Sequence, residues 1–114
     1  MSINSDIINA LSSLSLPVCP DVYDGDADEY ITFNYFSQGD DFADDAPQHE
    51  TYFVQVHYIC PLKKNSLSIR NQIKDALFTA GFTWPTVTNA MSTAYARDVD
   101  EQHWAFECEY AAEV

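Results

Sequence analysis

Glycine and positive charge are both scarce in this sequence. It has three glycines among 114 residues, too few for the glycine-rich loops that hold phosphates in nucleotide-binding sites. Its five basic residues all follow position 62: Lys63, Lys64, Arg70, Lys74 and Arg97. Binding to a phosphate backbone needs clusters of basic side chains. We therefore expect no direct contact with nucleic acid.

Long apolar runs are also missing. No run approaches the roughly 20 residues needed to cross a bilayer, and the net charge of −13 would be repelled by an anionic membrane surface. The opening MSINSDIINAL has neither the basic nor the long apolar region of a signal peptide. We expect a protein without membrane contact that is made in a cytoplasm.

Cysteine is present, but no CxxC pair is. A zinc site would need a histidine as a further ligand, and no histidine stands at metal-like spacing from a cysteine. We expect three reduced, largely buried thiols. The residues concerned are Cys19, Cys60 and Cys108, with His49, His57 and His103.

Negative charge and aromatic residues are abundant. Eleven of the 18 acidic residues precede position 63, so the first half of the chain carries most of the negative field. Hydrophobic residues make up 46% of the chain and aromatic residues 14%, which is enough for a core. The length suits one domain over residues 1–114.

Hydrophobic periodicity predicts an α+β fold. The expected order is helix, short strand, strand, long loop, strand, helix, strand, strand. Such an order favours a mostly antiparallel sheet with both helices packed on one face. The expected helices cover residues 3–14 and 67–80, and the expected main strands cover residues 30–36, 52–60, 87–95 and 103–110.

The expected loop over residues 37–50, SQGDDFADDAPQHE, is strongly acidic. It is longer than the usual hairpin loop, and long loops tend to be functional or disordered. Aromatic residues often anchor interfaces, so we predict an assembly loop in which Phe42 contacts a neighbour and the aspartates prevent premature association. The alternative is that Phe42 folds back on its own sheet. The aspartates are Asp40, Asp41, Asp44 and Asp45.

A second acidic segment, DGDADEY, partly fits a calcium-binding loop. Asp24, Asp26 and Asp28 stand at the first, third and fifth positions of an EF-hand loop. The glycine and the final glutamate of that loop are replaced by Glu29 and Tyr35. We therefore expect a solvated acidic turn.

The strand expected over residues 52–60 is apolar on both sides. Successive side chains of a strand point to opposite faces, so Phe53, Gln55 and His57 share one face. If the helices cover the other face, this one exposes aromatic area and marks a protein contact. The alternative is a sheet that curls and buries both faces. We expect His57 and His103 to be structural or surface residues, and with no nucleophile motif we expect no enzyme activity and no cofactor.

The element order and several segments resemble the tail terminator and tail-completion proteins of long-tailed bacteriophages, the family of lambda's tail terminator. The segments are YITFNYF, YFVQVHYI, IRNQIKDALFTAGF and HWAFECEY, between Ile3 and Tyr110. The closest local match is the final FECEY together with the pattern R-x-x-I-x-x-A-L-x-x-x-G-F, which comprises Arg70, Ile73, Ala76, Leu77, Gly81 and Phe82.

The resemblance implies a structural protein with an α+β fold, without catalysis, cofactor or metal. Members of the family form a ring, typically a hexamer, that caps the finished tail tube and joins it to the head connector. The implied partners are further copies of the chain, the tail tube protein and the connector. The implied location is the virion, after assembly from the host cytoplasm. DNA would pass through the ring without binding, and an acidic lumen would prevent adhesion.

A different class of protein also fits the charge: a small acidic DNA mimic that inhibits a nucleic-acid-binding protein. Its carboxylates would replace phosphates in a basic groove, spread over a rigid surface. In this sequence the acids gather in turns and in one expected loop, which favours assembly. A metal-dependent enzyme is a third possibility.

Overall fold

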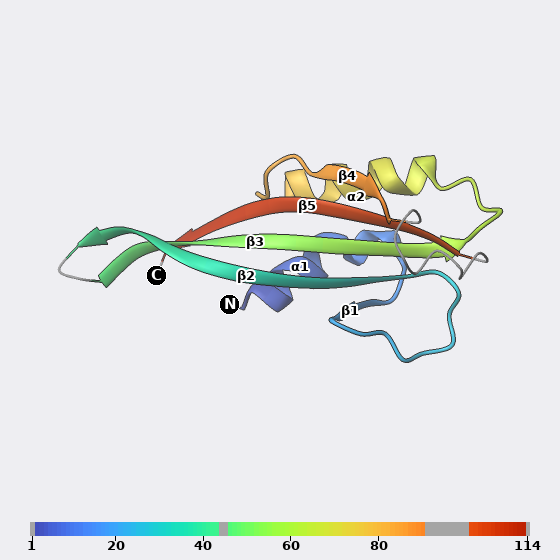
Figure 1. The fold of residues 1–114 in the computed structure, drawn as a ribbon, viewed down its shortest axis with the longest axis horizontal. Coiled ribbons are helices and arrows are strands. Elements are labelled where there is room, and N and C mark those ends of the chain that lie inside the picture. The colour runs from blue at the N-terminus through green and yellow to red at the C-terminus, as the bar shows by residue number, and fades with distance from the viewer. Residues whose placement is uncertain (1, 44–45, 91–100, 114) are drawn as a thin grey trace.

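The computed structural model describes residues 2–43, 46–90 and 101–113. The chain forms a five-stranded sheet in the order β1-β2-β3-β5-β4, in which β1 runs parallel to β2 and the other neighbours are antiparallel (Figure 1). The predicted α+β fold with a mostly antiparallel sheet is confirmed. The elements are α1 (Ile3–Leu11), a 3-10 turn (Ser12–Leu14), β1 (Val18–Pro20), β2 (Tyr30–Ala43), β3 (Ala46–Pro61), α2 (Leu67–Thr79), β4 (Thr86–Asn89) and β5 (Glu101–Glu113).

Both helices pack on the same face of the sheet, as predicted. The apolar stripe of α1 and the buried side of α2 meet one core cluster, which also takes alternate side chains from β2, β3 and β5. We call this side the covered face. Its fully buried residues include Ile7 and Leu11 of α1, Ile73 and Leu77 of α2, and Ile31, Phe33, Val56, Tyr58, Cys60 and Phe106 of the strands.

The helix ends follow local chemistry. Ser2 Oγ accepts a hydrogen bond from the Ser5 amide at 3.1 Å and so caps α1. Gly81 follows α2 with φ 103°, a conformation that only glycine adopts without strain. The Ser66 side chain does not cap α2. Instead, Asn65 Oδ1 accepts from the Leu67 amide at 3.3 Å.

The predicted loop over residues 37–50 is wrong, because most of it belongs to β2 and β3. Their pairing continues in one register from Tyr30 opposite Ile59 to Ala43 opposite Ala46. Asp40, Asp41 and Phe42 therefore lie in β2, whereas Asp44 and Asp45 lie outside the described residues. Strand pairing joins backbone groups, so a run of polar side chains does not by itself end a strand.

Two further boundaries differ from the prediction, and the cysteines agree with it. The first helix ends at Leu11 and continues as the 3-10 turn. The strand expected from position 87 is β4, which spans Thr86–Asn89, and residues 91–95 lie outside the described part.

All three cysteines are free, two of them buried. No helix in the described part of the chain is long and apolar enough to cross a membrane.

Gln102 of β5 joins the sheet to the turn between β3 and α2. Its side chain is buried, 8% exposed. Its Oε1 accepts hydrogen bonds from Ser66 Oγ at 2.8 Å and Trp104 Nε1 at 3.0 Å. Its Nε2 lies within hydrogen-bonding distance of three backbone carbonyls, those of Pro61 (3.1 Å), Leu62 (3.0 Å) and Lys64 (2.7 Å).

We predict that Gln102→Leu lowers the free energy of unfolding by about 2–4 kcal/mol, because buried polar groups lose their partner while the side-chain volume is kept. Urea denaturation followed by circular dichroism measures this. The control is Gln72→Leu, at an exposed position of α2, which should change stability by less than about 0.5 kcal/mol. Equal losses in the two variants would contradict the role of Gln102.

Candidate protein-interaction surface

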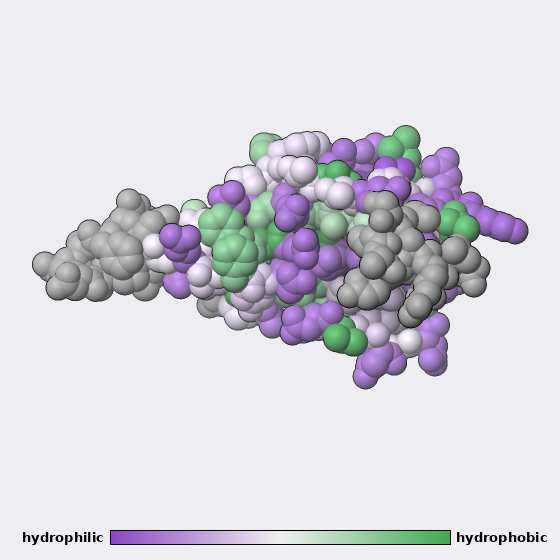
Figure 2. Space-filling view, viewed as in Figure 1, coloured by the Kyte–Doolittle hydropathy of each residue, from purple (hydrophilic) through white to green (hydrophobic). Residues whose placement is uncertain are grey.

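The side of the sheet opposite α1 and α2 is not covered by a second layer of described elements. Figure 2 shows this side, where apolar residues lie among hydrophilic ones. Thr32, Ile59 and Ala105 on this side are buried, so the exposed part is the half nearer the β2–β3 hairpin. We call this half, with the neighbouring histidines, the open face. Its side chains are Asn34, Phe36, Phe53, Gln55, His57, His103, Glu107 and Glu109.

An aromatic pair occupies the centre of the open face. Phe36 of β2 and Phe53 of β3 are direct cross-strand partners, and their rings stack with centroids 4.8 Å apart at 16°. The Phe36 side chain remains 65% exposed. Buried aromatic pairs stabilise a fold or an interface, but here Phe36 is largely open to solvent while Phe53 is half-buried.

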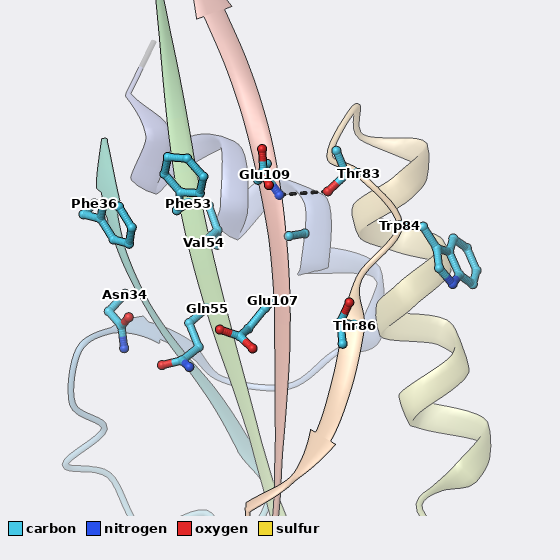
Figure 3. A pocket seen from close by; sticks show the side chains of 11 residues that line it. Asn34, Phe36, Phe53, Val54, Gln55, Thr83, Trp84, Thr86, Glu107 and Glu109 are labelled. Carbon is cyan, nitrogen blue, oxygen red and sulfur yellow. Dashed lines mark hydrogen bonds between the residues drawn. The ribbon is translucent and has the colours of Figure 1, made fainter. Parts of the chain in front are cut away.

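A shallow cavity of about 480 Å³ lies beside this pair (Figure 3). The segment after α2 forms one wall, with Thr83, Trp84 and Thr86. This wall is anchored to β5 by two hydrogen bonds of 2.9 Å. The Thr83 amide donates to the Glu109 carbonyl, and Thr83 Oγ1 accepts from the Glu109 amide.

Carboxylates line the β5 side of this cavity. Glu107 and Glu109 are exposed on the same strand, two residues apart. An apolar centre with a polar rim is the usual anatomy of a protein interface. The negative charge of this rim favours a partner segment that carries basic or neutral side chains at its edge.

Two histidines lie in contact on the same side of the sheet, separated from the aromatic pair by Asn34 and Gln55. His57 Nδ1 and His103 Nε2 are 2.8 Å apart, and Asn34 Nδ2 lies 3.3 Å from His57 Nε2. With Asn34 Nδ2 as the donor to His57 Nε2, the matching tautomer has His57 Nδ1–H donating to His103 Nε2. Burial lowers the pKa of both histidines, and for His57 the charge of His103 adds to this effect. The pair is therefore neutral at pH 7.

The described residues offer little for metal or nucleophilic chemistry. Within residues 2–43, 46–90 and 101–113, no group of three or more His, Cys, Asp or Glu side chains could hold a metal ion. The aspartates of the DGDADEY segment are exposed there. Burial raises the pKa of Cys108 to about 12, so its thiol stays protonated.

Three of the predicted interface residues lie together. Phe53, Gln55 and His57 point to the face away from the helices, as the alternation predicted, and the sheet does not curl into a second layer within the described residues. Sequence reasoning missed Phe36 and the contact between the histidines, because both depend on the register between strands. The alternation of YITFNYF is a signal for the position of Phe36, because it places Phe36 on the same side of the strand as Asn34.

No family model and no curated protein matches the chain. A solved structure of a protein whose name states no function has a similar fold, with a TM-score of 0.58 over 99% of this chain and 98% of that one. The two sequences are 12% identical, so the likeness concerns the fold alone.

We predict that the histidine pair makes stability fall with falling pH. Both pKa values lie below the ordinary value in the folded state, so the unfolded chain binds more protons as the pH falls through about 6.5. The free energy of unfolding should therefore drop more between about pH 8 and pH 5.5 in the natural protein than in the double variant His57→Gln/His103→Gln. Parallel pH profiles of the two proteins would refute this role.

Proposed function

We propose that the protein is a structural virion component that forms a homo-oligomeric ring, terminates a phage tail tube and joins it to the head connector. The observation that carries the proposal is the uncovered open face, with a stacked aromatic pair at its centre. The resemblance of the sequence to the tail terminator family supplies the kind of assembly. Large exposed apolar patches usually mark interaction sites.

The energetics of the open face favour association. Fully burying a phenylalanine side chain stabilises a complex by roughly 1.5–3 kcal/mol. Phe36 is 65% exposed. Aromatic residues carry much of the energy of measured interfaces. A neighbouring subunit that covers the open face would gain from burying this side chain.

The β2–β3 hairpin supports the same proposal by its shape. The last described residue of β5, Glu113, pairs with His49, so beyond this point the described sheet has two strands. Figure 1 shows this part extending past the helices. A two-stranded ribbon is marginally stable on its own. In a ring it would lie against the adjacent subunit, in the assembly role that the sequence predicted for residues 37–50.

The charge fits a ring through which DNA passes. A net charge of −13 repels the phosphate backbone, so DNA would slide through the lumen without adhesion. A head-to-tail contact, in which one surface meets a different surface of the next copy, generates closed rings. The hexamer is the ring size that the resemblance implies. No catalytic step is part of this role.

The DNA-mimic alternative rests on the exposed carboxylates of β5. Glu107 and Glu109 stand on a rigid strand, as acidic groups that replace phosphates would. The aromatic stack beside them favours assembly, because a basic nucleic-acid groove offers no apolar counterpart to Phe36 and Phe53. A monomer that binds a basic protein would support the mimic.

We predict that the protein assembles and that Phe36→Ala weakens the assembly. Light scattering after size exclusion should give a mass about six times 12.9 kDa at high concentration. Loss of one anchor should raise the concentration of half-assembly about tenfold or more, which corresponds to about 1.4 kcal/mol.

Leu67→Ala is the control, because Leu67 is 54% exposed at the start of α2, on the side of the sheet away from the open face. It should assemble like the natural protein. Equal weakening by Phe36→Ala and Leu67→Ala, or a strict monomer at every concentration, would count against the proposed function.

A further inference from the structure

The outer edge of β2 is longer than the strand that covers it. β1 pairs with β2 only at Ile31, Thr32 and Phe33, whereas β2 continues to Ala43. Among the described residues, no strand pairs with β2 on this side beyond Phe33. The sheet therefore ends here in an uncovered edge.

The direction of the backbone groups on this edge follows from two hydrogen bonds. The Ile31 amide donates outward to the Pro17 carbonyl, and the Phe33 carbonyl accepts from the Asp21 amide, both at 2.8 Å. The register with β3 is regular from Tyr30 to Asp40, so every second residue repeats this direction. The N–H and C=O groups of Tyr35, Ser37 and Gly39 consequently point away from the sheet. Such a row is a template for another strand.

The side chains of this edge do not protect it. Natural edge strands carry lysine, proline or other charges that prevent pairing with another chain. Residues 34–39 read NYFSQG and contain no charge and no proline, in a chain that is 20% charged. Tyr35 and Phe36 are exposed on opposite faces of the strand. A strand docked on this edge would therefore meet aromatic rings on both of its faces.

The opposite end of the same sheet carries a second edge of similar chemistry. β4 is the last strand in the sheet order, and Thr86 to Thr88 have no strand partner on their outer side among the described residues. Its sequence TVTN is also uncharged. In a molecule of net charge −13, two copies repel each other least where uncharged segments meet.

We propose that the β2 edge from Asn34 to Gly39 pairs, backbone to backbone, with the β4 edge of a second copy of this chain. This inference rests on the ring proposed above and names the strands that join its subunits. The pairing is head to tail, because each copy offers β2 on one side and β4 on the other, and such contacts can close into a ring.

The free β2 edge and the β4 edge are displaced from each other along the strand direction, and this displacement suits a closed ring of subunits. Register pairs align Thr86 of β4 with Glu107, Gln55 and Asn34. The free edge of β2 thus begins level with Thr86, the first residue of β4, and extends away from β4 towards the hairpin. Joining the two edges shifts each sheet along its strands relative to the next, and a closed barrel requires such a stagger.

Ser37→Pro tests the pairing directly. Proline removes the outward N–H of Ser37, which the β2–β3 ladder does not use, and edge positions of this kind tolerate proline. Ser37→Ala is the matched control, because it also loses the 3.3 Å hydrogen bond from Ser37 Oγ to Glu50 Oε1 but keeps the backbone N–H. We expect Ser37→Pro to stay monomeric in light scattering where the natural protein and Ser37→Ala assemble.

Hydrogen exchange on the natural protein gives a second readout that does not depend on a variant. The amides of Tyr35, Ser37 and Gly39 should be protected in the assembled protein and should exchange faster after dilution to monomers. If Ser37→Pro assembles like Ser37→Ala, or if these amides exchange rapidly in an intact ring, the strand pairing is overturned while the ring stands. A protein that stays monomeric at every concentration overturns both.

Discussion

The unbroken register between β2 and β3 is the constraint on which the rest of the structure depends. It runs from Tyr30 opposite Ile59 to Ala43 opposite Ala46 without a bulge. Because side chains alternate along a strand, this one register decides which residues meet the helices and which face away. It stacks Phe36 on Phe53 and directs the free amides of β2 outward. A slip of β2 by one residue would turn Phe36 towards the helices and expose residues such as Phe33 that now fill the core.

Negative charge and apolar surface act in opposite directions on this frame. The net charge of −13 makes copies repel one another, and salt screens this repulsion. The open face and the uncharged edge of β2 favour contact. In the proposed ring, these two effects would favour an orientation in which aromatic and uncharged segments meet while carboxylates such as Glu107 stay at the rim. Salt should therefore strengthen assembly, whereas it would weaken a complex held by the carboxylates.

The sequence predicted most elements, because helices and half-buried strands leave clear periodic patterns. The alternation in β3 placed Phe53 and Gln55 correctly on one face. It did not predict the length of the hairpin, because the polar residues 37–41, SQGDD, carry no hydrophobic alternation. It missed the contact of His57 with His103, two residues that are 46 positions apart in the sequence and lie on neighbouring strands. Nor does the sequence indicate the contact between the Ser66 hydroxyl and Gln102, which only the fold brings together.

Negative-stain electron microscopy of the natural protein at high concentration tests the central claim most directly. Head-to-tail contacts that close predict uniform rings with a central opening and a single subunit number. Symmetric dimers, open filaments or isolated monomers under conditions of low repulsion, at high salt and near neutral pH, would contradict the account.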